Sequence, residues 1–409
     1  MGASDLEQKK IVETGRMQGP EVLRCIAMMM VIILHFLDKG KYLEPLEGSG
    51  MTNTGMFAWL LEAFAISAVN LYMLISGYFL CETSFKLSRI ITLLIQVWTY
   101  SVLVGAGGIL LGFYPIESVT LHDILVILFP ISQEHYWFLT AYFYLYLLLP
   151  IIGGTIRKME QRTFRIVLAL FLGTFCVMKS ILPVRLETDG LGMDCLWYLC
   201  MFLTAAYFRR FGTDFLKKSW KGFLLYGTAS LAVFGLTFLI REIYLRKDVL
   251  KTILCVAYEY NHLFTFAASL GLFTVFIRQK ECAGIVGRWA CRIGKYTLGV
   301  YLLHENTTIR TKWPEWFGNG QAGTDIGNMG TAAFSNGNAT LMMLFRLMMA
   351  VCVVFIVGIL VECLRSRLMS ILHVGLQHLI PYQRLTQMIT KADSYFSEKR
   401  VEKGLKKKN

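Results

Sequence analysis

The feature that most constrains this chain is a series of apolar runs separated by short polar links. A helix needs about 20 apolar residues to cross the hydrocarbon core of a bilayer, and about ten runs here reach roughly 17–24 residues. In lipid, such runs must pair their backbone groups internally, which a helix does. We therefore predict an all-α, polytopic membrane protein with about ten transmembrane helices. The predicted spans are residues 20–38, 57–80, 89–112, 133–153, 164–183, 195–211, 221–241, 255–277, 294–311 and 341–363.

Composition supports the membrane class and argues against a soluble nucleic acid-binding protein. Hydrophobic residues make up 55% of the chain and charged residues 17%, as expected of an integral membrane protein. The net charge of +13 would suggest a nucleic acid partner in a soluble protein. Here the basic residues lie in the short links between apolar runs. We therefore attribute the charge to membrane topology and expect membrane lipids, not nucleic acid, around the chain.

The distribution of Lys and Arg predicts the orientation. If the N-terminus is cytoplasmic, most of the 41 basic residues fall in cytoplasmic segments, as the positive-inside rule requires. We expect both termini inside, with a cytoplasmic segment at 1–19, a transmembrane domain at 20–363 and a basic cytoplasmic tail at 364–409. The tail mixes apolar and basic residues, which predicts an amphipathic segment on the membrane surface followed by a disordered end.

Two predicted external segments and the ten cysteines are relevant to possible sugar, disulfide or metal sites. Residues 39–56 and 312–340 are polar and Gly-rich, and the second carries Trp313 and Trp316. A loop of this kind could contact a sugar by stacking and hydrogen bonding, or could be an ordinary connector with interfacial tryptophans. The ten cysteines lie mostly in apolar runs and form no CxxC pair, so we predict neither a disulfide framework nor a metal site.

The first span carries two ionisable residues, Arg24 and His35. Eleven helical steps make roughly three turns, so both side chains lie on one face, about 16 Å apart along the axis. Ionisable residues inside membrane helices are costly and are candidates for function. Arg24 suits a phosphate or carboxylate clamp, but it could also snorkel to the interface.

His35 is the candidate general base. Neutral imidazole can remove a proton from a hydroxyl near neutral pH. Alternatively, His35 hydrogen-bonds to a neighbouring helix. Asp38, three residues on, could orient the ring, or could face water at the helix end.

Five segments in chain order resemble the signature of the integral-membrane acyltransferase 3 family. The resemblance runs to about residue 363 and departs from the family pattern at Lys86 and Thr297, where the family has arginine and serine. The lysine keeps the charge but loses the bidentate geometry of arginine. The segments are Arg24-x10-His35, Val69–Leu80 with Asn70 and Ser76–Gly77, Lys86-Leu-Ser-Arg89, His135–Leu139 with Trp137, and Tyr296–His304.

The resemblance implies a multi-pass enzyme of the bacterial plasma membrane, an acyltransferase for groups other than aminoacyl. It would O-acetylate a surface polysaccharide or a lipid-linked sugar of the cell envelope. Acyl-CoA, most simply acetyl-CoA, would be the co-substrate, with no bound cofactor. The expected catalytic residues are His35 and Arg24, and the expected acyl-CoA contacts are Lys86 and Arg89. Further site candidates are Asn70, Ser76, Trp137, His304 and Asp38.

Each of the other matches also has a purely structural interpretation. Ser76–Gly77 could allow close helix packing. Lys86 and Arg89 are required by topology in any case. Trp137 could anchor at the interface, and His304 could end a helix in water.

Two rival functions stay open at this level. A transporter or flippase for a polysaccharide intermediate or a small metabolite would also suit buried Arg and His, although no internal repeat is evident. A structural or sensing module could keep the fold without catalysis. The sequence does not specify the acceptor sugar, the acyl group or the oligomeric state, nor whether His35 acts as a base or itself accepts the acyl group.

Overall fold

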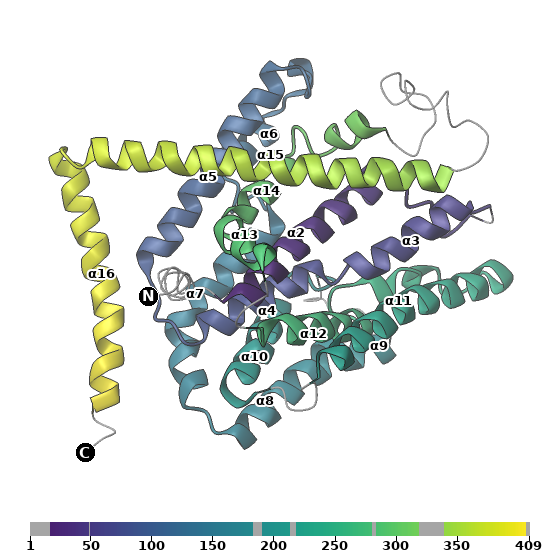
Figure 1. Cartoon of the computed structure of the whole chain (residues 1–409), viewed down its shortest axis with the longest axis horizontal. Coiled ribbons are helices and arrows are strands. Elements are labelled where there is room, and N and C mark those ends of the chain that lie inside the picture. The colour runs from purple at the N-terminus through teal and green to yellow at the C-terminus, as the bar shows by residue number, and fades with distance from the viewer. Residues whose placement is uncertain are drawn as a thin grey trace.

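The computed structural model of the chain is all-helical wherever it describes regular secondary structure (Figure 1). In that part of the chain, eight helices are long and apolar enough to cross a membrane. This finding confirms the predicted all-α, polytopic membrane class. The described residues are 17–48, 50–182, 190–212, 218–279, 284–318 and 339–405, with side chains up to 396. The predicted N-terminal segment, most of the 312–340 loop and the end of the tail lie outside them.

Each candidate span is a single helix or a run of helices with a local break. The eight are α2 (Gln18–Lys39), α3 (Asn53–Ala65) with α4 (Ala68–Leu80), α5 (Leu87–Leu110), α7 (Trp137–Lys158), α8 (Gln161–Leu172) with a π segment (Gly173–Met178) and α9 (Lys179–Ile181), α11 (Ser219–Lys247), two 3-10 turns (Lys251–Ile253, Val256–Tyr258) with α12 (Leu263–Ile277), and α15 (Ala339–Leu376). The remaining elements are α6 (Leu121–Leu128), α10 (Cys195–Phe211), α13 (Ile285–Ile293), α14 (Thr297–His304), α16 (Ile380–Leu405) and 3-10 turns at Ile116–Ser118, Gly294–Tyr296 and Trp313–Phe317.

The predicted 195–211 span is the helix α10, with the same bounds; at 17 residues it is shorter than the eight candidate spans, and it is buried along most of its length. The predicted 294–311 span is not a continuous helix, because α14 ends at His304 and turns follow. There Asn306 turns its amide to the Tyr100 carbonyl and the Tyr136 hydroxyl, which favours leaving the helix. An apolar run therefore overstated the length of this helix.

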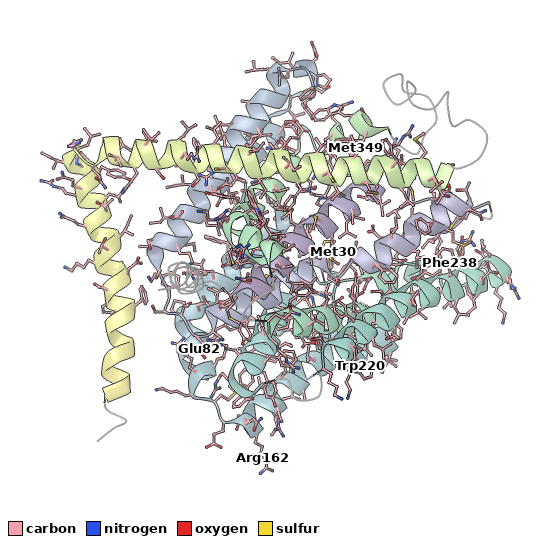
Figure 2. The ribbon with its side chains drawn as sticks, in the orientation of Figure 1. Met30, Glu82, Arg162, Trp220, Phe238 and Met349 are labelled. Atoms are coloured by element: carbon pink, nitrogen blue, oxygen red, sulfur yellow. The ribbon has the colours of Figure 1, made fainter. Side chains whose placement is uncertain are left out.

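The bundle has an inner and an outer set of helices. The most apolar stretch of α2 is 67% buried, whereas that of α15 is 22% buried. Large apolar side chains such as Trp220 on α11 and Met349 on α15 are exposed and point outward (Figure 2). Exposed apolar side chains of this kind suit a surface that faces the lipid tails of a bilayer. α2 is thus an inner wall, and the outer helices shield it.

Gly77 sets the close approach of two inner helices, α4 and α10. A Cβ at this position would lie 3.0 Å from Phe202 Cα and 3.1 Å from Ala205 Cβ. We expect Gly77→Val to destabilise the protein by about 1–3 kcal/mol through overpacking. Thermal unfolding of the purified protein in detergent measures the effect. Gly107→Val on α5, where a Cβ meets nothing within 4 Å, is the control, and equal melting of the two variants would contradict the close contact.

The tail continues the last span and then turns. α15 has 38 residues, about 57 Å of helix, roughly twice the hydrocarbon thickness, so it passes through residue 363 without a break. α16 runs across the direction of α15 (Figure 1) and packs on the start of α5. There Ser88 bonds to Asp393, and the rings of Phe85 and Phe396 are 4.9 Å apart. The domain limits and the cytoplasmic placement of the tail stay predictions.

Candidate active site

A cavity of about 500 Å³ runs along α2. Its lining extends from Met28 to Lys39, eleven residues or about 16 Å of helix. Most of the wall is apolar or aromatic, and the ionisable groups gather towards the Lys39 end. The charged and imidazole side chains of the lining are His35, Asp38, Lys39, Glu62, Glu259 and Glu305.

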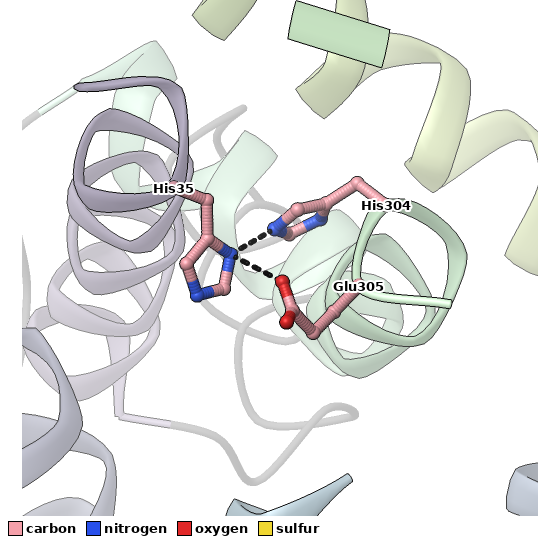
Figure 3. A group of neighbouring side chains, drawn as sticks. All are labelled: His35, His304 and Glu305. Carbon is pink, nitrogen blue, oxygen red and sulfur yellow. Dashed lines mark hydrogen bonds and ion pairs between the residues drawn. The ribbon is translucent and has the colours of Figure 1, made fainter. Parts of the chain in front are cut away.

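His35 meets two residues from the far end of the chain (Figure 3). Its Nδ1 lies 2.9 Å from His304 Nε2 and 3.0 Å from Glu305 Oε2. His304 is the last residue of α14 and Glu305 follows it, so the end of this short helix brings both to α2. The structure thus joins the two histidines of the sequence analysis, which are 269 residues apart.

The hydrogen bonds specify where each imidazole carries its proton. His304 Nδ1 lies 2.6 Å from the Val300 carbonyl, which can only accept, so this nitrogen is the donor. His304 lies outside the candidate spans, and burial, helped by the adjacent His35, lowers its pKa well below the usual range. Its Nε2 is then an acceptor. His35 Nδ1 must therefore donate, and in the neutral ring this leaves a lone pair on His35 Nε2.

This lone pair is turned away from the two partners. In Figure 3 the second ring nitrogen of His35 points away from His304 and Glu305. His35 also lines the cavity. A neutral imidazole with a free Nε2 beside a cavity can accept a proton from a bound hydroxyl.

Glu305 is a buried carboxylate held by cations. It forms an ion pair with Lys39, and Arg310 Nη1 lies 3.8 Å from its Oε1. Only 6% of Glu305 is exposed. A carboxylate at His35 Nδ1 favours the protonated form of that ring, so Glu305 can stabilise an imidazolium formed during a reaction.

The segment after α14 is fixed by a second polar network. Thr307 donates its backbone N–H to His135 Nε2 at 3.1 Å, and His135 Nδ1 then bonds Ser101 Oγ at 3.0 Å. Asn306 donates to the Tyr136 hydroxyl at 3.1 Å. These bonds join the segment to α5 and to the start of α7. They hold Glu305 at the cavity although no long helix continues there.

Two further predicted site residues line the cavity. Asp38 is exposed at its Lys39 end. Of the two alternatives for Asp38, the structure has the exposed helix end, and Glu305 lies at the His35 Nδ1 that Asp38 could have oriented. Trp137 also lines the cavity and stacks on Tyr260, with ring centroids 5.6 Å apart.

Asn70 and Ser76 are not in the lining of this cavity. The Asn70 amide is fully buried and used for packing: it accepts from Trp197 Nε1 at 2.9 Å and donates to the Tyr260 carbonyl at 2.8 Å. It thereby fixes Tyr260, against which Trp137 stacks. Ser76 is partly exposed beside Gly77.

The three predicted basic residues also lie outside the cavity lining. The Arg24 guanidinium contacts both carboxylate oxygens of Glu21 at 3.0 Å. Lys86 and Arg89 are exposed at the start of α5. One hydrogen bond connects Arg24 to the cavity wall: the hydroxyl of Tyr72, a lining residue, donates to the Arg24 carbonyl at 3.0 Å.

The ligand atoms of His35, His304 and Glu305 all lie within 4.8 Å of one another, which is close enough to hold a metal ion. The charges around them disfavour a divalent cation, because Lys39 shares the Glu305 carboxylate and Arg310 is adjacent. We therefore expect purified protein incubated with zinc and desalted to retain well below one zinc per chain. Elemental analysis measures this. Stoichiometric zinc that is lost in His304→Ala would contradict the expectation.

Lys39, Glu62, Glu259 and Glu305 are the ionisable cavity residues that sequence reasoning missed. Glu305 lies inside the predicted 294–311 span, beside a polar stretch. Glu62 lies inside an apolar run, and an acidic residue in a membrane span is itself a signal of function. That signal was available for both Glu62 and Glu305.

Comparison with known proteins gives one match. The acyltransferase 3 family, described as an acyltransferase domain, matches residues 17–363. No curated protein and no solved structure matches the chain. The family match covers most of the 409 residues. The chain therefore belongs to the acyltransferase 3 family of membrane acyltransferases.

Proposed function

We propose that this acyltransferase moves an acyl group, acetyl in our expectation, from cytoplasmic acyl-CoA to a hydroxyl of a surface polysaccharide or a lipid-linked sugar. The observation that carries the proposal is the state of His35. Its Nδ1 is bound by His304 and Glu305, so the neutral ring keeps a lone pair on Nε2, and His35 lines the cavity. This is the arrangement that a general base for a hydroxyl needs.

The chemistry follows from that arrangement. His35 Nε2 takes the proton of the acceptor hydroxyl while the hydroxyl oxygen attacks the thioester carbonyl. The tetrahedral intermediate then collapses, the carbon–sulfur bond breaks, and the CoA thiolate recovers the proton from His35. Glu305 stabilises the imidazolium between these two events. No acyl group needs to rest on the protein.

The donor would approach from the cytoplasmic end of α2. CoA phosphates suit basic residues, and we assign Arg24, Lys86 and Arg89 to that role. In the structure Arg24 is held by Glu21, so a bound phosphate would replace the Glu21 carboxylate. The thioester would then reach His35 along the 16 Å or so of the cavity beside α2.

The test is mass spectrometry of the surface glycans of source cells that lack the protein. We expect the loss of one acyl mass from a glycan that is otherwise present. Complementation with the unchanged protein should restore it, and His35→Ala should not. A glycan that disappears entirely from the surface would favour the transporter interpretation. A glycan profile that does not change would contradict this choice of acceptor.

A further inference from the structure

Glu62 is a buried carboxyl with no use in the chemistry above. It lies in α3, is 9% exposed, and lines the same cavity as His35. Its Oε2 has no hydrogen-bond partner in the described part of the chain. A buried polar atom without a partner is costly, and such atoms persist where a ligand satisfies them.

The other acidic groups of the cavity are accounted for. Glu305 pairs with Lys39, and Glu259 Oε2 lies 2.6 Å from Lys179 Nζ. Asp38 is exposed at the edge of the cavity. Glu62 forms no salt bridge among the described residues, so no cation there explains its burial.

The wall around Glu62 is aromatic, and its polar atoms are engaged. Trp59 lies one helical turn away on α3, and its Nε1 donates to the Glu44 carbonyl at 2.9 Å. The Tyr258 hydroxyl donates to the Trp59 carbonyl at 2.7 Å. Trp137 and Tyr260 form a stacked pair in the same lining. These rings and the Glu62 carboxyl thus line one cavity.

We propose that Glu62 binds the acceptor, through a hydroxyl that neighbours the one deprotonated by His35. The ligand is then a polyol of the sugar class, because one hydroxyl must meet Nε2 while another meets the carboxyl and the ring faces meet its C–H surface. This inference rests on the proposed function. It adds that recognition of the acceptor requires two of its hydroxyls.

The experiment uses the full chain, purified in detergent, with acetyl-CoA and the total glycan fraction of source cells that lack the protein. Thiol release from acetyl-CoA is measured without glycan, where water is the acceptor, and with rising glycan concentration. For Glu62→Ala we expect the half-saturating glycan concentration to rise about tenfold or more, as for a lost buried hydrogen bond. Release to water should stay within about twofold.

Glu62→Gln is the conservative variant, because it keeps a donor and an acceptor at the same place. For a hydroxyl ligand, glutamine should recover most of the lost affinity. If glutamine is as poor as alanine, the ligand is a cation and the polyol assignment is overturned. If Glu62→Ala lowers release to water as much as release to glycan, Glu62 is not an acceptor-binding residue. Glu117→Ala, at an exposed carboxyl in the 116–118 turn, is the matched control and should change neither.

A binding measurement separates this inference from the proposed function. Trp59 and Trp137 line the cavity, so a bound glycan should change the tryptophan fluorescence without any donor present. If the unchanged protein releases no thiol under any condition, the proposed acyl transfer from acetyl-CoA fails. The fluorescence titration still decides on Glu62: affinity weakened in Glu62→Ala supports the inference, and affinity equal to that of the unchanged protein overturns it.

Discussion

Replacing His35 by alanine should lower acyl transfer by at least about 10²-fold and by up to about 10⁴-fold, the range that a positioned general base contributes. The reason is that His35 Nε2 is the uncommitted nitrogen of the His35–His304 pair at the cavity. The measurement is thiol release from acetyl-CoA in the presence of the acceptor fraction, at matched amounts of folded protein.

His122→Ala provides the matched control, because His122 is an exposed histidine of α6, outside the cavity lining. It should transfer acyl groups at the unchanged rate. Full activity in His35→Ala with normal expression would remove His35 from the mechanism. Equal losses in both variants would point to general damage to the fold.

Replacing Glu305 by glutamine should lower acyl transfer by about 10²-fold, because the imidazolium of His35 loses its counter-ion at 3.0 Å. Residues that act as one unit are strongly non-additive. We therefore expect the His35→Ala, Glu305→Gln double variant to be no slower than His35→Ala alone. Steady-state rates of the unchanged protein, the two single variants and the double variant complete a double-mutant cycle.

Glu305→Gln also leaves the partly buried ammonium of Lys39 without its partner, which costs up to about 3 kcal/mol of stability. Lys39→Met in the same chain removes that charge, so it should restore thermal stability. It should not restore the rate. Recovery of activity along with stability would show that Glu305 serves packing and not the His35 ring.

The spans were predictable from the sequence because a bilayer imposes one length on each apolar run. This length rule failed at 294–311, where a span was predicted but α14 stops at His304. The break depends on partners elsewhere in the chain: Asn306 bonds to Tyr136, and Thr307 bonds to His135. A rule that scores one segment at a time does not contain such contacts.

The site was predictable in part for the same reason. His35 is visible as an imidazole in an apolar helix, and the family resemblance brings in His304. The contact between the two rings depends on tertiary structure, and so does the position of Glu305, rather than Asp38, at His35 Nδ1. Asp38 has the better position along the helix, but it is exposed and does not hold the ring. Short sequence separation was a poor guide to the orienting carboxylate.

The one-way chain of hydrogen bonds from His35 to His304 to the Val300 carbonyl has a consequence for membrane energetics. His304 keeps its own Nδ1 proton on a carbonyl, which cannot pass it on. His35 therefore has no relay to either aqueous phase through its partner ring. In the mechanism proposed above, the proton taken from the acceptor leaves with the thiol. Acyl transfer should then move no net proton across the membrane. Its rate in sealed vesicles should not respond to an imposed protonmotive force.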